Sequence, residues 1–197
     1  DEYEIEEHLI NELAEHGYSL LISVDCGISS YGALKKAKEY GIKVIVLDHH
    51  IGDMSKLTDY HIYINPWMKK KWPEGTENLS GAGIAYKFVE GMGILVPGLR
   101  EERANNFIEL VAMSIISDSL TLTGENRILV KEGLRKIPFT PLKGLAYLIE
   151  KQKIKEPVYI KDVAMKITPL TNSPGRFGKP DVSLKLLMEK NERHIRE

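Results

Sequence analysis

Two short apolar segments of this sequence each end in side chains that can bind metals. Asp25 directly follows the run LLISV, and Asp48, His49 and His50 directly follow the run KVIVL. If these runs are neighbouring parallel strands, about 4.8 Å apart, their carboxyl ends lie side by side and the four side chains converge. Carboxylates held this close repel one another, and a divalent cation relieves the repulsion. Imidazole with carboxylate ligands suits a transition metal such as Mn or Zn, whereas ligation by oxygen alone would indicate Mg or Ca.

A third acidic position extends the pattern. Asp118 ends the apolar segment LVAMSIIS and stands between Ser117 and Ser119, so it is a further candidate ligand. A strand-terminal aspartate alone is more often only a cap for the next helix, and a histidine pair alone is more often part of a loop. Two such strand ends in one crossover unit favour a metal site over these ordinary explanations.

The elements that must position these groups follow from hydrophobic periodicity. Continuous apolar runs at 20–24 and 43–47 predict parallel strands buried on both faces, and HIYIN at 61–65 is a candidate third strand. The segment IKDVAMKITPLTNSPGRFGK is predicted to be looped. Helices are predicted at 3–15, from Ser29 or Ser30 to Tyr40, at 101–117, 127–137 and 141–151, and from Pro180 or Asp181 to the end.

Composition places the chain among ordinary globular proteins. Its 197 residues, 43% hydrophobic and 28% charged, suit one domain, or one and a part, with a real core. A formal net charge of -1 gives no global argument for a nucleic-acid partner, so any basic surface must be local. The one cysteine, Cys26, excludes an internal disulfide framework and is consistent with a reducing cytosol. No apolar run approaches the ~20 residues that a membrane helix needs, so we expect a cytoplasmic protein without membrane association.

Five segments, in this order, resemble those of the DHH phosphoesterases: SVDCGIS, VLDHH, LSGAGIAYKF, SIISDSLTLTGENRILVKEGL and TNSPGRFG. Within that family they are most similar to the RecJ-type exonucleases specific for single strands, and the last two segments favour this branch. The resemblance implies an α/β fold with a parallel-sheet DHH phosphoesterase core, helices on both faces and a helical C-terminal part. It places the core, lacking its first motif, at 1–137, and a helical remainder with the start of a connector helix at 138–197.

The same resemblance implies a phosphodiesterase with two metal ions, Mn²⁺ or Mg²⁺. By this analogy Asp25 bridges both ions, His49 and Asp118 bind one of them, Asp48 orients the site from behind, and His50 faces the scissile phosphate. The ions would generate a hydroxide and support in-line displacement at phosphorus. The implied activity is 5′ to 3′ degradation of single-stranded DNA in repair and recombination, with repair or replication proteins as candidate partners.

Two motifs are candidate contacts to the nucleic-acid backbone. In SGAG, Ser80, Gly81 and Gly83 precede a helix, where backbone N–H groups can bind phosphate. The alternative is a capped helix whose glycines permit close packing. In TNSPGRFG, Asn172 and Arg176 match the family positions that hold the strand, and arginine suits bidentate phosphate binding. The alternative there is an ordinary proline-glycine turn.

Three other features are given ordinary explanations. The lysine run 69–71 between Trp67 and Trp72 is a candidate platform for single strands, but a solvated loop whose tryptophans pack on the domain is favoured. Cys26 has no base placed for it by the sequence and is interpreted as a small buried filler. Nothing in the sequence around His61 indicates a function beyond that of an ordinary surface or strand residue.

Several features depart from the family pattern. An upstream Asp-x-Asp motif that completes both metal sites has no counterpart, so we expect a fragment with weak or no activity on its own. Leu170, Ser173 and Pro174 stand where RecJ-like chains usually carry an arginine and two alanines. The later DHH-associated and OB-type domains are also missing from the sequence. Two other functions stay open: a phosphodiesterase for short oligonucleotides or cyclic dinucleotides, and a non-enzymatic replication-complex scaffold with a DHH core.

Overall fold

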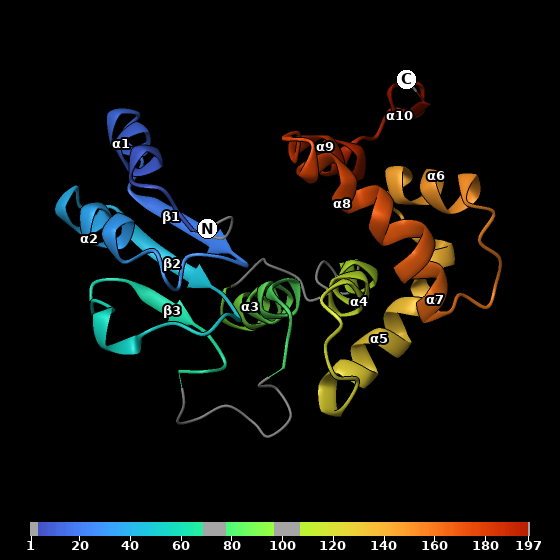
Figure 1. Ribbon diagram of the computed structural model, residues 1–197, viewed down its shortest axis with the longest axis horizontal. Helices are drawn as coiled ribbons and strands as arrows, with labels where there is room; N and C mark the ends of the chain where they lie inside the picture. The colour runs from blue at the N-terminus through green and yellow to red at the C-terminus, as the bar shows by residue number, and fades with distance from the viewer. Residues whose placement is uncertain (1–3, 69–77, 97–106, 197) are drawn as a thin grey trace. The chain divides into compact units, whose positions relative to one another are not determined.

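The chain folds into two compact units, Asp1–Gly91 and Met92–Glu197. The first unit holds a parallel sheet and the second is helical (Figure 1), which confirms the predicted α/β class with a helical C-terminal part. The predicted domain boundary at 137 lies inside the second unit and stays a prediction. No helix in the described part of the chain is long and apolar enough to cross a membrane. The computed structural model describes residues 4–68, 78–96 and 107–196.

A three-stranded parallel sheet, in the order β1-β2-β3, forms the centre of the first unit. The strands are β1 (Leu20–Val24), β2 (Lys43–Leu47) and β3 (Ile62–Ile64). Both pairs are parallel and in continuous register, so the carboxyl ends of all three strands meet at one edge of the sheet. The first two predicted strands are confirmed with the expected bounds, and the third is shorter than HIYIN.

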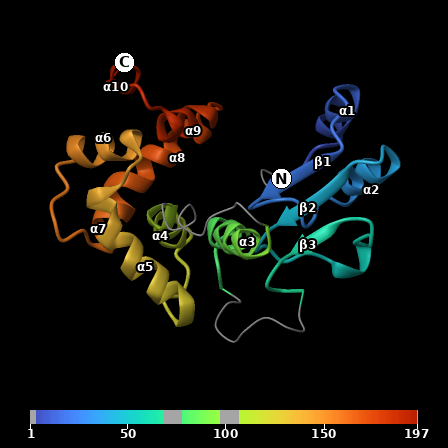
Figure 2. The ribbon, with the colours of Figure 1, turned by 180° about the vertical axis from the view of Figure 1, so that it is seen from behind.

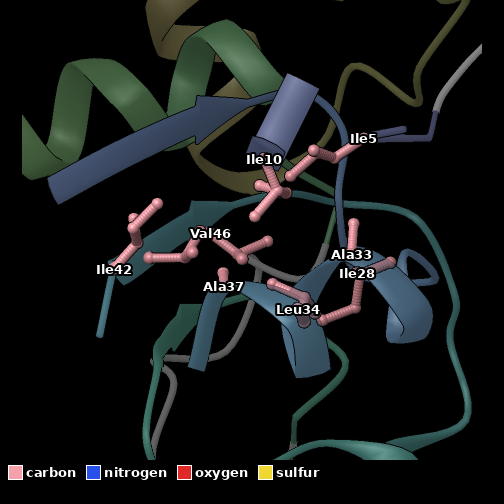
Figure 3. Packing of buried hydrophobic residues seen from close by; sticks show 9 residues of the cluster. Ile5, Ile10, Ile28, Ala33, Leu34, Ala37, Ile42 and Val46 are labelled. Atoms are coloured by element: carbon pink, nitrogen blue, oxygen red, sulfur yellow. The ribbon is translucent and has the colours of Figure 1, made fainter. Parts of the chain in front are cut away.

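Two helices, α1 (Glu7–Glu15) and α2 (Tyr31–Glu39), cover one face of this sheet. Their apolar side chains pack with those of β2 in one cluster, in which Ile10, Leu34 and Val46 are at most 2% exposed (Figure 3). Because α2 connects β1 to β2, the predicted parallel crossover is present. The remaining helical elements that begin in this unit are η1 (Met54–Lys56) and α3 (Gly81–Leu95).

The prediction that β1 is buried on both faces is wrong. Leu20, Ile22 and Val24 alternate along the strand and are 50%, 44% and 46% exposed. Ser23, which points to the opposite face, is buried. β1 lies at the edge of the described sheet, and a continuous apolar run does not reveal whether a second layer covers each face of a strand.

The second unit is built around α4 (Ile108–Ser117) and α5 (Gly124–Lys136), which pack closely together. Gly133 permits this contact, because a Cβ atom there would lie 2.3 Å from the Cβ of Ala112. Residues 101–106 of the helix predicted at 101–117 lie outside the described residues. The remaining elements (Figure 2) are η3 (Ile137–Phe139), α6 (Lys143–Lys151), α7 (Ile160–Asp162), η4 (Val163–Ile167), α8 (Thr168–Arg176), α9 (Asp181–Met188) and α10 (Glu192–Arg196).

Two expectations for the second unit are wrong. The segment expected to be looped is helical across α7, η4 and α8. Val163 and Ile167, four residues apart, are 0% exposed, so one face of this continuous helical stretch is buried. The last helix is also interrupted, because Glu189 has an extended backbone that separates α9 from α10.

His61, just before β3, is a buried structural residue. Its Nδ1 accepts a hydrogen bond from the backbone N–H of Val44 (3.1 Å), and its Nε2 donates to the carbonyl of Leu34 (2.7 Å). Burial lowers the pKa of the His61 imidazole more than the hydrogen bond to Leu34 raises it. The neutral ring therefore ties β2 to α2, a role that the sequence did not indicate.

Acidification should destabilise the first unit through His61. Its pKa in the folded chain lies below the ordinary value of about 6.5, so the unfolded chain takes up a proton first. The stabilising contribution is complete above about pH 6.5 and decreases as the pH falls below it. Urea unfolding followed by tryptophan fluorescence should therefore show a smaller loss of stability, from about pH 7.5 to about 5.5, in His61→Gln than in the native chain.

An exposed histidine provides the control for this experiment. His8 is 67% exposed in its side chain, so His8→Gln should retain the pH dependence of the native chain. An equal acid-induced loss of stability in the native chain and in His61→Gln would contradict the role given to His61.

Candidate metal centre

The hydrogen-bond ladder of the sheet continues one residue past each of the first two strands. The backbone N–H of Asp25 donates to the carbonyl of Leu47 (2.8 Å), and that of Asp48 donates to the carbonyl of Ile64 (3.2 Å). The two aspartates therefore stand at neighbouring strand ends. The sheet places them there because β1 and β2 are parallel and in register up to Val24 and Leu47.

Three side chains converge at this edge of the sheet. Asp25, His49 and His50 each offer a ligand atom, and these atoms all lie within 4.8 Å of one another. The Nε2 of His49 is 3.1 Å from Oδ1 of Asp25, and the two imidazole rings lie edge to face with centroids 4.5 Å apart. We name these three residues the strand-end cluster.

Asp48 lies beneath the cluster and is 1% exposed. Its Oδ1 accepts hydrogen bonds from Nδ1 of His50 (2.7 Å) and from the backbone N–H of the same residue (3.1 Å). Its Oδ2 accepts from the backbone N–H of Ile28 (3.0 Å). A carboxylate at Nδ1 fixes the orientation of the His50 ring and favours the tautomer whose Nε2 is the acceptor. The geometry thus gives Asp48 an orienting position and gives His50 a defined ring orientation.

Asp25 adopts an unusual backbone conformation for a residue with a side chain. Its φ is 64°, in the left-handed region that few non-glycine residues occupy. Such strain persists only where the surrounding structure enforces it, and it is common at functional sites. Here the turn after β1 and the hydrogen bond to Leu47 hold the residue in place.

Gly81, the first residue of α3, gives the Asp25 carboxylate its space. A Cβ atom at this position would lie 2.1 Å from Oδ1 of Asp25 and 2.4 Å from its Cγ. These distances are far shorter than any van der Waals contact, so glycine is required for the observed position of the carboxylate. This close approach supports the packing alternative for this glycine, and a phosphate contact by its N–H stays a prediction.

The cluster fits a divalent transition metal. Oδ1 of Asp25 is shielded from solvent and accepts no hydrogen bond from the described residues, with His49 only at ion-pair distance. A buried acceptor without a donor is costly, and a cation would satisfy it. Imidazole with a carboxylate oxygen is a ligand combination suited to Mn or Zn, and Nε2 of His49 and Oδ1 of Asp25 lie 3.1 Å apart.

Two residues after β3 hold the backbone of the histidine pair. Asn65 is 1% exposed, and its Nδ2 donates to the carbonyl of His50 (2.9 Å). The indole N–H of Trp67 donates to the carbonyl of His49 (3.0 Å), and its backbone N–H donates to Oδ1 of Asn65 (2.8 Å). Neither contact was predicted from the sequence, because a hydrogen bond to a backbone carbonyl far away in the chain has no local sequence pattern. The lysine run 69–71 and Trp72 lie outside the described residues.

Replacing Asn65 by leucine should weaken metal binding at the cluster. The change keeps the size of the side chain but removes the donor that fixes the carbonyl of His50. It also removes the acceptor that holds the backbone of Trp67, whose indole fixes the carbonyl of His49. Loss of a group that orients a ligand typically lowers metal affinity by about 10–100-fold. The Mn²⁺ affinity of each chain can be measured by titration, with the free ion monitored through its electron paramagnetic resonance signal. Trp67→Phe, which removes one donor but keeps an aromatic ring, should show a smaller loss of Mn²⁺ affinity. Native Mn²⁺ affinity in a folded Asn65→Leu chain would contradict the role of Asn65 in positioning the cluster.

Ser80 and Gly83 form the cap of α3. Ser80 is 0% exposed, and its Oγ accepts a hydrogen bond from the backbone N–H of Gly83 (3.1 Å). A serine at this position satisfies one of the free N–H groups of the first helical turn. The hydroxyl is thereby occupied within the helix, so the predicted phosphate contact rests on the remaining backbone N–H groups.

The other predicted site residues belong to the second unit. Asp118 is the residue that ends α4, and the following Ser119 has a φ of 55°. Nδ2 of Asn172 donates to Oγ of Ser117 (3.1 Å), next to Asp118 in the sequence. Arg176 is the last residue of α8 and is exposed, so the segment is a helix end and not a simple turn.

Cys26 is poorly suited to act as a nucleophile. Burial raises the pKa of its thiol, and the negative charges of Asp48 and Asp25 raise it further. The reactive form of cysteine is the thiolate, which this environment disfavours. The side chain packs against the core under α1 and α2, as expected for a small filler.

Comparison with known proteins agrees with the geometry of the strand ends. A sequence profile of the N-terminal domain of the DHH family matches residues 2–115, which is more than half of the chain. The chain belongs to the DHH family.

Relatives within the family are RecJ proteins. The chain is 32% identical over 186 residues to the single-stranded-DNA-specific exonuclease RecJ of Thermus thermophilus, covering 91% of this chain and 26% of the relative. It is 32% identical over 190 residues to the protein of the same name from Bacillus subtilis, covering 94% and 22%. The chain thus spans about a quarter of the length of these curated relatives.

Solved structures give the same result. A crystal structure of exonuclease RecJ bound to manganese superposes with a TM-score of 0.85 at 28% identity, covering 98% of this chain and 47% of the other. A crystal structure of RecJ from Thermus thermophilus in complex with Mn²⁺ superposes with a TM-score of 0.84 at 30% identity, covering 97% and 28%. The predicted fold and the predicted RecJ-like membership of the DHH family are therefore confirmed.

Proposed function

We propose that this chain carries part of the catalytic centre of a metal-dependent nuclease that degrades single-stranded DNA from its 5′ end. The observation that carries the proposal is the strand-end cluster of Asp25, His49 and His50, supported from below by buried Asp48. The similarity to relatives named single-stranded-DNA-specific exonuclease RecJ supports the substrate. The similarity to manganese-bound RecJ structures supports the ion.

The residues of the cluster have separate roles in this proposal. Asp25 and His49 would hold Mn²⁺ or Mg²⁺, and Asp118 would be a further carboxylate ligand. His50, its ring fixed by Asp48, faces the scissile phosphate. When bound, the ions supply an activated water at neutral pH and stabilise the charge that develops at phosphorus.

The remaining predicted residues would bind the DNA backbone. The backbone N–H groups of Ser80 and Gly81 stand at the start of a helix whose dipole favours an anion, whereas the N–H of Gly83 donates to Oγ of Ser80 and shapes this helix start. Asn172 and Arg176 would hold the strand from α8, where both are exposed. A role in DNA repair and recombination, repair or replication proteins as partners, and a cytoplasmic location complete the proposal.

The test uses single-stranded oligonucleotides labelled at the 5′ or the 3′ end. The substrates are incubated with Mn²⁺ and either the 197-residue chain or a longer form of the protein that contains it. We expect mononucleotides to be released from the 5′ end by the longer form, activity to stop on chelation, and duplexes of equal length to remain intact. Single strands left intact by the longer form with Mn²⁺ present would overturn the nuclease proposal. A preference for dinucleotides over long strands would instead indicate a small-substrate phosphodiesterase.

A further inference from the structure

An apolar groove of about 600 Å³ lies in the second unit, and nothing in the proposed nuclease reaction uses it. It is lined by residues of α5 and η3, by Leu122 and by residues 156–160, the last of which begins α7. Its volume lies in the range of ligand-binding clefts. Its lining is mainly aliphatic and includes Val130, Leu134 and Pro138.

Large apolar side chains are exposed along this groove. Phe139 is 72% exposed and Ile160 is 41% exposed, and both line it. Contact of these apolar surfaces with water is unfavourable, and their burial by a bound molecule would be favourable. An exposed apolar groove bounded by charged side chains is typical of a binding site for another molecule.

The cations that line the groove indicate the charge of its occupant. Arg127, Lys131 and Arg135 follow one another at intervals of four residues along α5 and all line the groove, whereas Glu156 is its one acidic lining residue. Cations four residues apart on a helix repel one another. Arg135 has Glu132 as a partner at 3.0 Å, but neither Arg127 nor Lys131 has an ion pair within the described residues.

The position of Arg127 strengthens this argument. It lies in the first turn of α5, which begins at Gly124. The helix dipole makes a positive charge unfavourable in a first turn, where it favours an anion. Glu125 in the first turn and Arg135 in the last turn both suit the dipole, whereas the positive charge of Arg127 does not. An anionic group placed at this end of the groove would pair with Arg127 and with the dipole together.

We propose that this groove binds an acidic peptide segment of a partner protein, with an apolar anchor residue in the groove and carboxylates on Arg127 and Lys131. A peptide fits the lining better than a nucleic-acid strand does. Single strands are bound by stacking of bases on several aromatic side chains, whereas Phe139 is the one aromatic residue in this lining. The proposal is independent of the metal centre, and its test does not depend on nuclease activity.

The test selects ligands from a displayed library of random peptides on the immobilised 197-residue chain. Peptides that also bind the charge-reversed chain Arg127→Glu/Lys131→Glu are removed. We expect the retained sequences to combine several Asp or Glu residues with a large apolar residue. Enrichment of sequences without acidic residues, or no enrichment above that on the charge-reversed chain, would overturn the proposal.

Fluorescence anisotropy of one selected peptide then locates the site. Arg127→Glu/Lys131→Glu and, separately, Phe139→Ser should each weaken binding roughly tenfold or more, since centrally placed anchors carry most of the binding free energy. Lys151→Glu, an exposed cation on α6, is the matched control and should bind as the native chain does. If the peptide bound the native chain and all three variants with equal affinity, the groove would not be its binding site. Displacement of the peptide by an oligothymidylate at lower concentration than by unlabelled peptide would assign the groove to nucleic acid instead.

Discussion

Gly81→Ala should nearly abolish metal binding, although it adds only one methyl group. The new Cβ would lie 2.1 Å from Oδ1 of Asp25 and 2.5 Å from its Cβ, so the carboxylate must leave its position. Asp25 cannot adjust easily, because its φ of 64° and its hydrogen bond to Leu47 fix the backbone. We expect Mn²⁺ affinity to fall by more than about 100-fold, beyond the loss typical of groups that only orient a ligand.

The same helix offers a matched control for this experiment. Gly91→Ala also replaces a glycine of α3, and its new Cβ would meet nothing within 4 Å. Alanine favours a helix over glycine by about 1 kcal/mol, so this variant should be as stable as the native chain or more stable, with unchanged metal affinity. Circular dichroism confirms that both chains are folded, and native Mn²⁺ affinity in folded Gly81→Ala would show that the carboxylate is not held as described.

Asp25→Asn should also remove metal binding, and in a longer form that contains this chain it should remove the proposed nuclease activity. The substitution keeps the size of the side chain, and asparagine tolerates a left-handed backbone, so the fold should persist. It replaces the anionic oxygen that faces His49 with a neutral group. Mn²⁺ affinity and the rate of mononucleotide release should each fall by more than about 100-fold.

Stability provides the second measurement for Asp25→Asn. A carboxylate oxygen that is shielded from solvent and lacks a donor destabilises the metal-free chain. Its replacement should therefore leave the urea midpoint unchanged or raise it, which is the usual trade-off at functional sites. Asp59→Asn, at an exposed position, is the control. A large loss of folding stability in Asp25→Asn, with a fall in Mn²⁺ affinity no larger than that loss explains, would indicate a structural role instead.

The convergence of the strand ends could be predicted from sequence because it needs only two facts. Apolar runs of strand length, joined by one helix, form neighbouring parallel strands. The residues after each run then meet at one edge, which brings Asp25 to Asp48 and its histidines without any knowledge of packing. The division between an orienting Asp48 and an outward-facing His50 came only from resemblance to a family.

Other features depend on contacts between residues far apart in sequence. The space that Gly81 leaves for Asp25, and the hydrogen bond from Asn65 to His50, have no local signature. The exposed face of β1 was missed for the same reason, because layers of the fold are not encoded within a strand. The helix α8 was missed because its prolines and glycine indicate a turn, while buried Val163 and Ile167 in the stretch directly before it favour a helix.

The three hydrogen bonds at Asp48 have a consequence for reading large mutation surveys of this protein. Its carboxylate accepts one hydrogen bond from Ile28 and two from His50. It therefore stabilises the turn after β2 as well as the orientation of the His50 ring. A screen scored by cellular abundance would therefore mark Asp48 as intolerant of change, while Asp25 would tolerate asparagine and glycine, the residues that suit its left-handed backbone. A screen scored by DNA cleavage would mark both. The difference between the two maps, more than either alone, separates the residue that builds the motif from the residue that binds the ion.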